Sequence, residues 1–512
     1  MTPRVLLSVA FCLGCAEGGG DQTSSPSTDA TTDTSAVADS GASDSGDAVL
    51  EASTDTASDV FDAGPPLPLQ MKNLGAGLQI YPGGGYRYGP SIAINGDGSV
   101  EMWTCSPGAD GAWDYVRHRH STDGGKTWSA DTVAIAPTKG SRDAFSACDP
   151  GAVKIGTYWY VGYTSTEDSR GTANHLYVAR STNAAGPFEK WNGTGWGGNP
   201  QPIVTYKGDA SKYGIGEPSM VVVKDKLYVF YSYVDAQGFT DLSLADATRA
   251  DWPATLVDKG HVITRRANAE DSTDLKWVDS LNRFVGVTTY DRFSDASTIG
   301  VYQSFDGLSF EPVSFQGPRV QPGAHNVGIS GTPEGHLDTT KPNFIAYAYQ
   351  PPGKSWGDWP TYLDPITLGP TSPGAAVGGA VSTYLDWSWS GPKAWDGDPG
   401  TVWSSKSHGG TADAAESIAI DLGRLTAVKG IRIVPRATGL AFPVDFTIQT
   451  SETGATWTDV VSKTAFANPG STPVELPFTA SARWLRLSAS KLGADDFGNH
   501  YLQLAEVSAL LP

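Results

Sequence analysis

The chain has few cysteines, no long apolar run and little helical periodicity. Only four of its 512 residues are cysteine, and only Cys105 and Cys148 lie beyond the first 70 residues. A membrane-spanning helix needs about 20 consecutive apolar residues, and no segment supplies them. A disulfide between the two cysteines and a pair of free buried thiols both fit this count, because sequence alone does not fix the distance between them.

Basic residues are also scarce. Lys and Arg total 36 against 55 Asp and Glu, which gives a formal net charge of −19. Eleven of the acidic residues, and no Lys or Arg, lie in residues 16–70, a segment built mainly of Ser, Thr, Ala, Asp and Gly. Such a composition buries too little apolar area to fold, so we predict a disordered tether. Nothing in this charge balance suggests a nucleic-acid partner.

The first fifteen residues have the features of an export signal. Arg4 precedes a short apolar run over residues 5–13, and Cys12-Leu13-Gly14-Cys15 resembles a bacterial lipobox with Cys15 as the lipidated residue. We therefore expect residues 1–15 to be a lipoprotein-type signal. It would place the protein, lipid-anchored, on the outer surface of a bacterial cell envelope. A secreted protein is the alternative.

Residues 71–370 consist of strand-like runs separated by turn signals. β-branched and aromatic residues fill these runs, as in Leu227-Tyr228-Val229-Phe230-Tyr231. The pattern repeats about every 50 to 60 residues, a spacing that suits the four-stranded blades of a β-propeller. We expect five blades, which begin near Tyr88, Cys148, Gly216, Ser272 and His325.

A turn motif supports this architecture. Ser121-Thr122-Asp123-Gly124-Gly125-Lys126-Thr127-Trp128 is similar to the Asp-box of sialidase-like propellers, and residues 304–310 are a weaker copy. The resemblance implies that Asp123 caps backbone N–H groups in a hairpin turn and that Trp128 packs between blades. We interpret both residues as structural.

Two acidic residues open adjacent blades. Cys148-Asp149-Pro150 and Gly216-Glu217-Pro218 resemble the openings of the second and third blades in glycoside hydrolase families 43 and 32. The resemblance implies that Glu217 is the general acid and that Asp149 orients sugar hydroxyls or tunes the pKa of Glu217. The alternative is that each acidic residue only caps a turn and has a purely structural role. Both families open the first blade with an Asp, where this chain has Gly89.

The first blade also resembles that of sialidases. In Tyr86-Arg87-Tyr88-Gly89-Pro90 the Arg stands near the place of an Arg that grips the substrate carboxylate, a task that suits a guanidinium group. The resemblance implies that Arg87 binds substrate, close to Asp149 and Glu217. Tyr88 and Asp274 are further candidates for substrate binding or for replacing the missing carboxylate.

Residues 375–512 carry five separated motifs that resemble one family. They are Ala394-Trp395-Asp396-Gly397-Asp398, Ile420-Asp421-Leu422-Gly423, Gly430-Ile431-Arg432-Ile433, Phe446-Thr447-Ile448-Gln449-Thr450 and Leu504-Ala505-Glu506-Val507. The segment looks like a discoidin or coagulation-factor type C domain, the family that includes carbohydrate-binding module family 32. The resemblance implies a β-sandwich of the galactose-binding-like jelly-roll type.

The same resemblance implies two sites in this segment. A structural Ca2+ would be bound by Asp396, Asp398, Thr401 and Glu506, because calcium prefers a cage of oxygen ligands. A sugar would be bound by loop residues at one end of the sandwich, namely His408, Arg436, Phe497 and Asn499.

These features together predict an all-β protein with a five-bladed β-propeller, a β-sandwich and a disordered N-terminal tether. We expect an exported, lipid-anchored protein that acts on a polysaccharide or glycoconjugate, with a propeller resembling glycoside hydrolases. No organic cofactor is implied. The alternative is a non-catalytic glycan-binding protein or adhesin of the cell surface. The discriminating observation is whether Asp149 and Glu217 share one pocket with a third acid.

Overall fold

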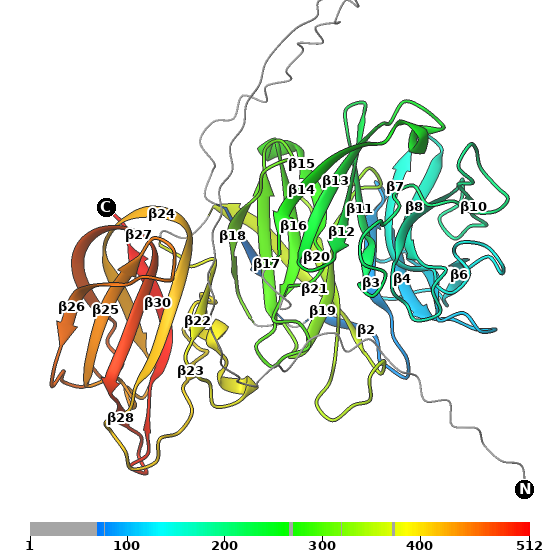
Figure 1. Ribbon diagram of the computed structural model, residues 1–512. Helices are drawn as coiled ribbons and strands as arrows, with labels where there is room; N and C mark the ends of the chain where they lie inside the picture. The colour runs from blue at the N-terminus through cyan, green and yellow to red at the C-terminus, as the bar shows by residue number, and fades with distance from the viewer. Residues whose placement is uncertain (1–68, 76, 266–269, 319, 371–373) are drawn as a thin grey trace, which may run out of the picture. The chain divides into compact units, whose positions relative to one another are not determined.

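The computed structural model describes residues 69–512, apart from residues 76, 266–269, 319 and 371–373 (Figure 1). The predicted signal with Cys15, and the predicted tether up to residue 68, lie outside the described residues. No helix in the described part is long and apolar enough to cross a membrane. Its helices are four short 3-10 turns: η1 (Trp252–Thr255), η2 (Asp279–Leu281), η3 (Trp387–Trp389) and η4 (Gly391–Ala394).

The first three blades are four-stranded antiparallel sheets whose strands follow chain order. Blade 1 comprises β3 (Tyr88–Ile94), β4 (Val100–Pro107), β5 (Asp114–Ser121) and β6 (Thr132–Ile135). Blade 2 comprises β7 (Cys148–Ile155), β8 (Tyr158–Ser165), β9 (His175–Ser181) and β10 (Glu189–Lys190). Blade 3 comprises β11 (Gly214–Val223), β12 (Lys226–Val234), β13 (Gly238–Asp246) and β14 (Val257–Thr264).

The last blade includes a strand from the N-terminal side of the propeller. Blade 4 comprises β15 (Asp274–Val278), β16 (Arg283–Tyr290), β17 (Thr298–Ser304) and β18 (Glu311–Gln316). Blade 5 comprises β19 (Ala324–Gly331), β20 (Asn343–Tyr349), β21 (Thr361–Pro370) and, as its outermost strand, β1 (Leu69–Asn73). β2 (Leu78–Tyr81) also pairs with β21. Because β1 precedes blade 1 in the chain and completes blade 5 by pairing with β21, it closes the ring. Its parallel pairing with β18 joins blade 5 to blade 4.

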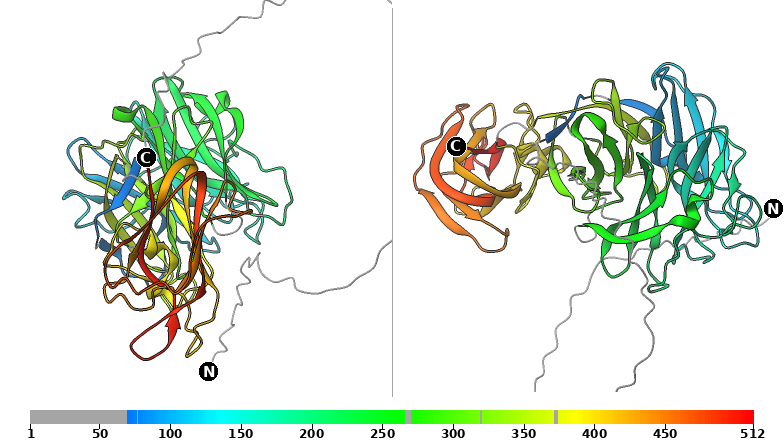
Figure 2. Two further views of the ribbon diagram at one scale, coloured as in Figure 1. Left: turned by 90° about the vertical axis from the view of Figure 1, so that its left-hand side faces the viewer. Right: turned by 90° about the horizontal axis from the view of Figure 1, so that it is seen from above.

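The predicted fold class is confirmed. Blades 1 and 2, coloured blue to cyan, lie on the opposite side of the propeller from blade 4 in light green, as the views in Figures 1 and 2 show. At the turn between β5 and β6, Asp123 accepts hydrogen bonds from the N–H groups of Lys126 and Thr127. Trp128 packs against the apolar cluster formed by blades 1 and 5. Both side chains hold the architecture together and lie away from the channel residues described below.

Four of the five innermost strands begin with the same irregularity. Gly89, Asp149, Glu217 and Asn326 have φ angles of 56°, 47°, 52° and 48°, in the left-handed region. Each lies at a register shift between the innermost strand and its neighbour. Such a bulge re-aims a side chain and is common next to functional sites. The shared bulge turns equivalent positions of blades 1, 2, 3 and 5 towards the channel.

A disulfide joins the first two blades. Cys105 in β4 and Cys148 at the start of β7 are bonded, with their Cα atoms 4.7 Å apart. Both residues are buried. Of the two possibilities open at the sequence level, the structure therefore contains the disulfide. It fixes the strand end that carries Asp149.

The C-terminal sandwich is built around two long bent strands. They are β24 (Glu416–Pro435) and β27 (Val474–Lys491), which pair with each other along most of their length. The remaining strands are β22 (Gly378–Val381), β23 (Trp403–Ser404), β25 (Asp445–Ser451), β26 (Thr458–Lys463), β28 (Gly493–Ala494), β29 (His500–Tyr501) and β30 (Gln503–Leu510). The main sheet has the order β23-β30-β24-β27-β25-β26.

The sandwich has a hydrophobic core of its own. The core includes Trp403, Ile420, Ile433, Leu485 and Leu504, and every member of this cluster lies between Ala376 and Leu511. A segment that buries its apolar side chains against one another is able to fold alone. The sandwich therefore has an apolar core that is distinct from the apolar clusters of the propeller.

Candidate functional site

A small central cavity collects residues from all five blades. Its volume is about 30 Å3. Blade 1 contributes Gly89, blade 2 Asp149, blade 3 Glu217, blade 4 Asp274 and blade 5 Asn326. The sequence-predicted pair, Asp149 and Glu217, thus lines one cavity although the two residues are 68 positions apart. The bulges of the innermost strands are the local cause.

Glu217 is surrounded by hydrogen-bond donors. The Ser232 hydroxyl donates to its Oε2, and the Arg265 guanidinium lies 3.5 Å from the same atom. The Asn326 side-chain amide donates to Oε1 at 3.2 Å. The backbone N–H of Glu217 donates to the Thr164 hydroxyl at 2.8 Å, which fixes the bulge. Neutral and charged donors together stabilise a negative carboxylate.

Asp149 lies in a different environment. It is 8% exposed, and the Tyr213 hydroxyl donates to its Oδ2 at 3.2 Å. Burial raises the pKa of Asp149 well above its usual range, and the nearby Glu217 carboxylate adds to the increase. The hydrogen bond from Thr164 opposes these effects without outweighing them. Burial and the neighbouring negative charge thus both favour the protonated form of Asp149, whereas the family resemblance assigned the acid role to Glu217.

A third carboxylate, Asp271, adjoins this pair. The guanidinium of Arg292 donates to its Oδ1 at 2.8 Å, and the backbone N–H of Asn326 donates to its Oδ2 at 2.7 Å. Burial alone would raise the pKa of Asp271, but Arg292 and the Asn326 N–H outweigh it and leave that pKa below its usual value. Asp271 is fully buried and occupied by these donors. It positions Asn326 and Arg292 beside Glu217.

Two other predicted positions, Asp274 and Gly89, also line the cavity, but Asp274 is held by hydrogen bonds and Gly89 has no carboxylate. Asp274 accepts hydrogen bonds from Ser219 at 2.7 Å, Lys276 at 2.6 Å and the Ile329 N–H at 2.8 Å, so it ties blades 3, 4 and 5 together. Gly89 occupies the blade 1 bulge. A Cβ atom there would lie 3.6 Å from Asp149 Oδ1. The position at which the family carries its first-blade Asp is thus next to Asp149 and has no side chain.

The structure places Arg87 outside this constellation. Its Nε donates to Asp131 at 2.8 Å, its Nη2 lies 2.6 Å from the same carboxylate, and its guanidinium stacks on the Tyr81 ring at 4.7 Å. Asp131 also binds Arg119. A guanidinium held in this way within blade 1 does not meet Asp149 and Glu217, contrary to the arrangement that the sialidase resemblance implied.

A group of aromatic side chains adjoins Asp149, whose charge acts on Tyr86 and Tyr88. We call Tyr86, Tyr88, Phe293, Trp356 and Trp359 the aromatic rim. Their ring centroids form a continuous series, with spacings of 4.6 Å between Trp356 and Trp359 and 5.6 Å between Trp359 and Tyr88. The Tyr88 hydroxyl lies 2.9 Å from Cys148 Sγ, so the rim adjoins the residue before Asp149. Tyr88 therefore lies beside Asp149 but does not line the central cavity.

The rim combines exposure with backbone strain. Trp356 is 54% exposed and Phe293 is 42% exposed. Phe293 has a φ of 60°, which is unusual for a bulky residue, and such strain is concentrated at functional sites. Its ring packs 4.3 Å from that of His325, and burial lowers the pKa of His325 to about 4. Exposed aromatic faces of this kind can stack on the apolar C–H face of a sugar.

The predicted calcium ligands contain a buried acidic pair. The side chains of Asp396 and Glu506 hydrogen-bond to each other. Burial raises the pKa of each, and the proximity of the Asp396 charge raises that of Glu506 further. Glu506 Oε1 is buried and has no hydrogen-bond partner. The Thr401 hydroxyl donates to Asp396 Oδ2 at 2.8 Å.

This arrangement fits a divalent cation. An orphaned carboxylate oxygen beside a second buried carboxylate is the donor set that calcium prefers. In the same turn, Asp398 Oδ1 accepts a hydrogen bond from the Gly400 N–H at 2.8 Å. Asp396, Thr401 and Glu506 therefore lie together between the first loop and β30, and Asp398 lies in the adjoining turn.

The predicted sugar-binding residues come from neighbouring loops of the sandwich. The His408 N–H donates to the His500 carbonyl, which joins one loop to the β28–β29 hairpin, whose tip is visible in Figure 1. His408 pairs with Glu416 at 2.8 Å, and Asn499 donates to Asp495 at 3.3 Å. Phe497 is 90% exposed.

Arg436 extends this group of loops. It donates to Gln503 at 2.6 Å, and its charge acts on Asp495 in the hairpin. The loops that hold His408, Arg436, Phe497 and Asn499 thus lie at one end of the sandwich, with a fully exposed ring beside polar groups. The sequence did not point to Asp495, which organises the hairpin turn through its carboxylate.

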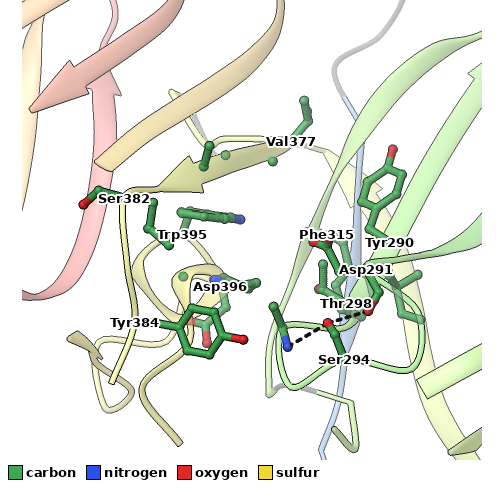
Figure 3. Close-up of a pocket in the computed structure, with 18 of the residues that line it drawn as sticks. Tyr290, Asp291, Ser294, Thr298, Phe315, Val377, Ser382, Tyr384, Trp395 and Asp396 are labelled. Atoms are coloured by element: carbon green, nitrogen blue, oxygen red, sulfur yellow. Dashed lines mark hydrogen bonds between the residues drawn. The ribbon is translucent and has the colours of Figure 1, made fainter. Parts of the chain in front are cut away.

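A larger cavity lies elsewhere. It has a volume of about 500 Å3, and Figure 3 shows Tyr290, Asp291, Ser294, Thr298 and Phe315 on one side and residues of the segment 377–396 on the other. The Ser294 hydroxyl donates to the Asp291 carbonyl at 2.6 Å within its wall. None of the carboxylates of the central cavity lines it. Volume alone therefore does not mark the catalytic candidates.

Comparison with known proteins bears on the sandwich most directly. Residues 379–507 match the F5/8 type C domain family, which confirms the resemblance predicted for this segment. The chain therefore joins a propeller to an F5/8 type C domain. A search of curated proteins finds no match.

Several solved structures are similar in part. A family 117 glycoside hydrolase of Zobellia galactanivorans is 17% identical, with a TM-score of 0.43, over 59% of this chain and 91% of that chain. An exo-β-1,3-galactanase of Phanerochaete chrysosporium is 11% identical, with a TM-score of 0.39, over 83% and 96%. A family 32 carbohydrate-binding module of C. perfringens, solved with galactose, is 20% identical, with a TM-score of 0.23, over 26% and 91%. Because these TM-scores are below 0.5, the fold assignment rests on the strand topology.

Proposed function

We propose that the propeller hydrolyses glycosidic bonds and that the sandwich targets it to a polysaccharide or glycoconjugate. The observation that carries the proposal is the convergence of Asp149 and Glu217 in one cavity with Asp271 behind them. Paired carboxylates in which one holds a proton and the other is ionised are what glycoside hydrolysis requires. The aromatic rim supplies surfaces for stacking on sugar rings.

For the sandwich we propose sugar binding at the loop end and a structural calcium ion. Phe497 and Arg436 offer a ring face and a guanidinium to a sugar. Asp396, Asp398, Thr401 and Glu506 would hold the ion, whose charge would offset the repulsion between the two buried carboxylates. The ion would stabilise the loops and would take no part in the propeller chemistry.

Export and lipid anchoring at Cys15 are further parts of the proposal. They rest on the sequence of the first fifteen residues alone. Cys15→Ser should move the protein from the membrane fraction to the soluble fraction of the producing cell. Retention of the variant in the membrane fraction would contradict the anchor.

The decisive experiment measures reducing sugars released from a panel of polysaccharides. Glu217→Gln keeps the shape of the side chain but removes its charge and its proton chemistry. We expect it to lower kcat by at least about a hundredfold, the usual contribution of a catalytic acid or base. Glu189→Gln is the matched control, because Glu189 is on the outer strand β10 with 59% of its side chain exposed. Equal activity of wild type and Glu217→Gln would show that Glu217 is not catalytic.

One observation favours a second function. Gly89 supplies no carboxylate at the position where families 43 and 32 have an acid. If the propeller only binds glycans, the full chain should retain polysaccharide affinity while releasing no sugar from any member of the panel. The protein would then act as a surface glycan-binding protein.

A further inference from the structure

The two carboxylates of the central cavity are held so differently that their roles can be assigned. We propose that Asp149 is the general acid and that Glu217 is its ionised partner, which reverses the roles implied by family resemblance. The inference rests on the proposed function, that the propeller cleaves glycosidic bonds. It names which residue gives the proton and which receives one.

The contacts of Glu217 favour the ionised form. Both of its oxygens accept hydrogen bonds, from the Ser232 hydroxyl and the Arg265 guanidinium at Oε2 and from the Asn326 amide at Oε1. A guanidinium always carries its charge, so it stabilises a negative partner at any ordinary pH. The side chain of Arg265 is only 7% exposed, which keeps water from screening the pair.

On balance, the groups that face Glu217 from the other blades also favour its ionised form. Arg292 approaches from the β16–β17 loop, where it binds Asp271 and also interacts with the Glu217 charge. Asp271 is itself neutralised by that guanidinium and by the Asn326 N–H. The only uncompensated acidic neighbour that the described residues place against Glu217 is Asp149.

The contacts of Asp149 favour the protonated form. Among the described residues no Lys, Arg or His forms an ion pair with it. Its polar neighbours are the hydroxyls of Tyr213 and Thr164 and, 3.2 Å from Oδ1, the disulfide sulfur of Cys148, and all three are uncharged. The acidic groups that face it are Glu217 and, from β5, Asp114. Asp114 is itself buried and bound by Tyr86 at 2.5 Å and Ser146 at 3.0 Å. A carboxyl group in such surroundings keeps its proton.

The glycine at position 89 also supports the role of Asp149 as the proton donor. Because a Cβ atom at position 89 would be only 3.6 Å from Asp149 Oδ1, an acidic side chain there would place another charge against the proposed proton donor. Glycine leaves that side of Oδ1 without a side chain. The departure from the family pattern in blade 1 is thus consistent with the acid having moved to blade 2.

The proposed reaction is a hydrolysis that balances. Asp149 gives its proton to the glycosidic oxygen as the bond from that oxygen to the anomeric carbon breaks, and the bonding electron pair leaves with the oxygen. A water molecule adds to the anomeric carbon and gives one proton to the Glu217 carboxylate. The products are two hydroxyl groups, with Asp149 ionised and Glu217 protonated. Exchange with solvent returns the proton to Asp149.

The first test locates the proton without a substrate. Infrared difference spectra of the full chain record the C=O stretch of protonated carboxyl groups from acidic to neutral pH. We expect Asp149→Asn to remove one such band throughout this range. Glu217→Gln should keep that band but shift its titration to lower pH, because the variant removes a neighbouring negative charge. Loss of the band at every pH in Glu217→Gln, and not in Asp149→Asn, would overturn the inference.

The second test uses leaving groups, with the nitrophenyl and methyl glycosides of the sugar identified in the polysaccharide screen. A nitrophenyl oxygen needs little help from a general acid. The fold decrease in kcat caused by Asp149→Asn should therefore be at least about ten times smaller on the nitrophenyl glycoside than on the methyl glycoside. Glu217→Gln should lose at least about a hundredfold on both. The opposite pattern would return the acid role to Glu217.

The two tests separate this inference from the proposed function. If wild type cleaves no substrate, the proposed function fails, and the infrared result still decides which carboxyl holds the proton. If wild type cleaves a substrate and the band belongs to Glu217, the proposed function stands and the reversal of roles fails.

Discussion

At the scale of single residues, Trp356 is the most exposed member of the aromatic rim, and it projects from the loop between β20 and β21. Stacking of a sugar on its ring would contribute mainly to binding. We predict that Trp356→Ala raises KM for an oligosaccharide substrate roughly tenfold, equivalent to about 1.4 kcal/mol, with a smaller effect on kcat. Steady-state kinetics on wild type and variant measure the two constants separately.

Trp113 provides the matched control for this variant. It is 39% exposed and packs against Phe145, outside the rim. Trp113→Ala should leave KM within about twofold of wild type, since it removes a comparable ring without touching the site. Equal effects of the two substitutions would argue against a specific role of the rim.

A second prediction concerns Glu506. Its pKa and that of Asp396 are raised in the folded state, so in the absence of a cation these groups stabilise the sandwich most at low pH. That stability is lost as the pH rises from the ordinary carboxyl range towards and beyond neutrality. Calcium should cancel the loss, because an ion bound only by the folded state stabilises it. Melting temperatures of the 375–512 fragment against pH, with calcium and with a chelator, test this.

Substitution of the same residue sharpens the test. Glu506→Gln replaces a group that is ionised in the unfolded chain at neutral pH but must take up a proton on folding, because its folded-state pKa is about 9. In chelator at neutral pH it should therefore raise the melting temperature, while calcium should no longer add to it. Glu475→Gln is the control, because Glu475 in β27 has 59% of its side chain exposed and lies apart from the site. If calcium leaves the melting temperature of the wild-type fragment unchanged at every pH, the proposed metal site is wrong.

Some residues of the central cavity could be predicted from the sequence and others could not, for physical reasons. Asp149 and Glu217 could be found because each precedes a Pro at the start of a strand. Asn326 precedes Val327 in the equivalent bulge, so the same signal was weaker. Within Glu270-Asp271-Ser272-Thr273-Asp274 the sequence pointed to Asp274, which lines the cavity, but it did not show that Asp271 shares the Asn326 amide with Glu217, because that contact depends on the loop conformation. Arg265 and Arg292 come from loops whose approach depends on packing between blades.

At the scale of elements, the Cys105–Cys148 disulfide connects β4 with β7 and encloses 43 residues in sequence. Such a crosslink restricts the unfolded chain and typically stabilises by about 2–4 kcal/mol. We predict that the double variant Cys105→Ala, Cys148→Ala lowers the free energy of unfolding of the propeller by that amount. Urea denaturation followed by the fluorescence of propeller tryptophans measures it.

The same variant should also affect the site. Asp149 directly follows Cys148, so a looser strand end should lower kcat more than a stability loss alone would. A disulfide-free variant with the wild-type denaturation midpoint would show that the bond is dispensable. The pairing itself could not be predicted from two cysteines, because it depends on how blades 1 and 2 are placed side by side.

The elements were easier to foresee than their contacts. Runs of β-branched and aromatic residues indicated the strands of β11, β12 and β16, and the spacing of the runs indicated blades. The outermost strand of blade 5 was not foreseen, because β1 comes from the other end of the propeller and its five residues carry no sign of their partner.

At the scale of the whole molecule, the propeller and the sandwich each bury a core of their own, which agrees with a division of work between cleavage and targeting. We predict that a fragment without residues 375–512 retains kcat on a small soluble glycoside. On an insoluble polysaccharide its rate should fall, because the sandwich no longer raises the local concentration of enzyme at the surface. Rates of sugar release from both substrates test this, and equal losses on both would contradict the division.

The closing strand β1 has a mechanical consequence. If the protein is tethered by the chain that precedes Leu69, any drag on the bound polysaccharide is transmitted through β1 to the anchor. β1 pairs antiparallel with β21 and parallel with β18. Leu69 at its start lies opposite Pro370, the last residue of β21 before the sandwich, so a pull between the tether and the sandwich would peel β1 from β21 one hydrogen bond at a time. The ladder with β18 is a second set of bonds that must also break before the anchor is torn from the ring.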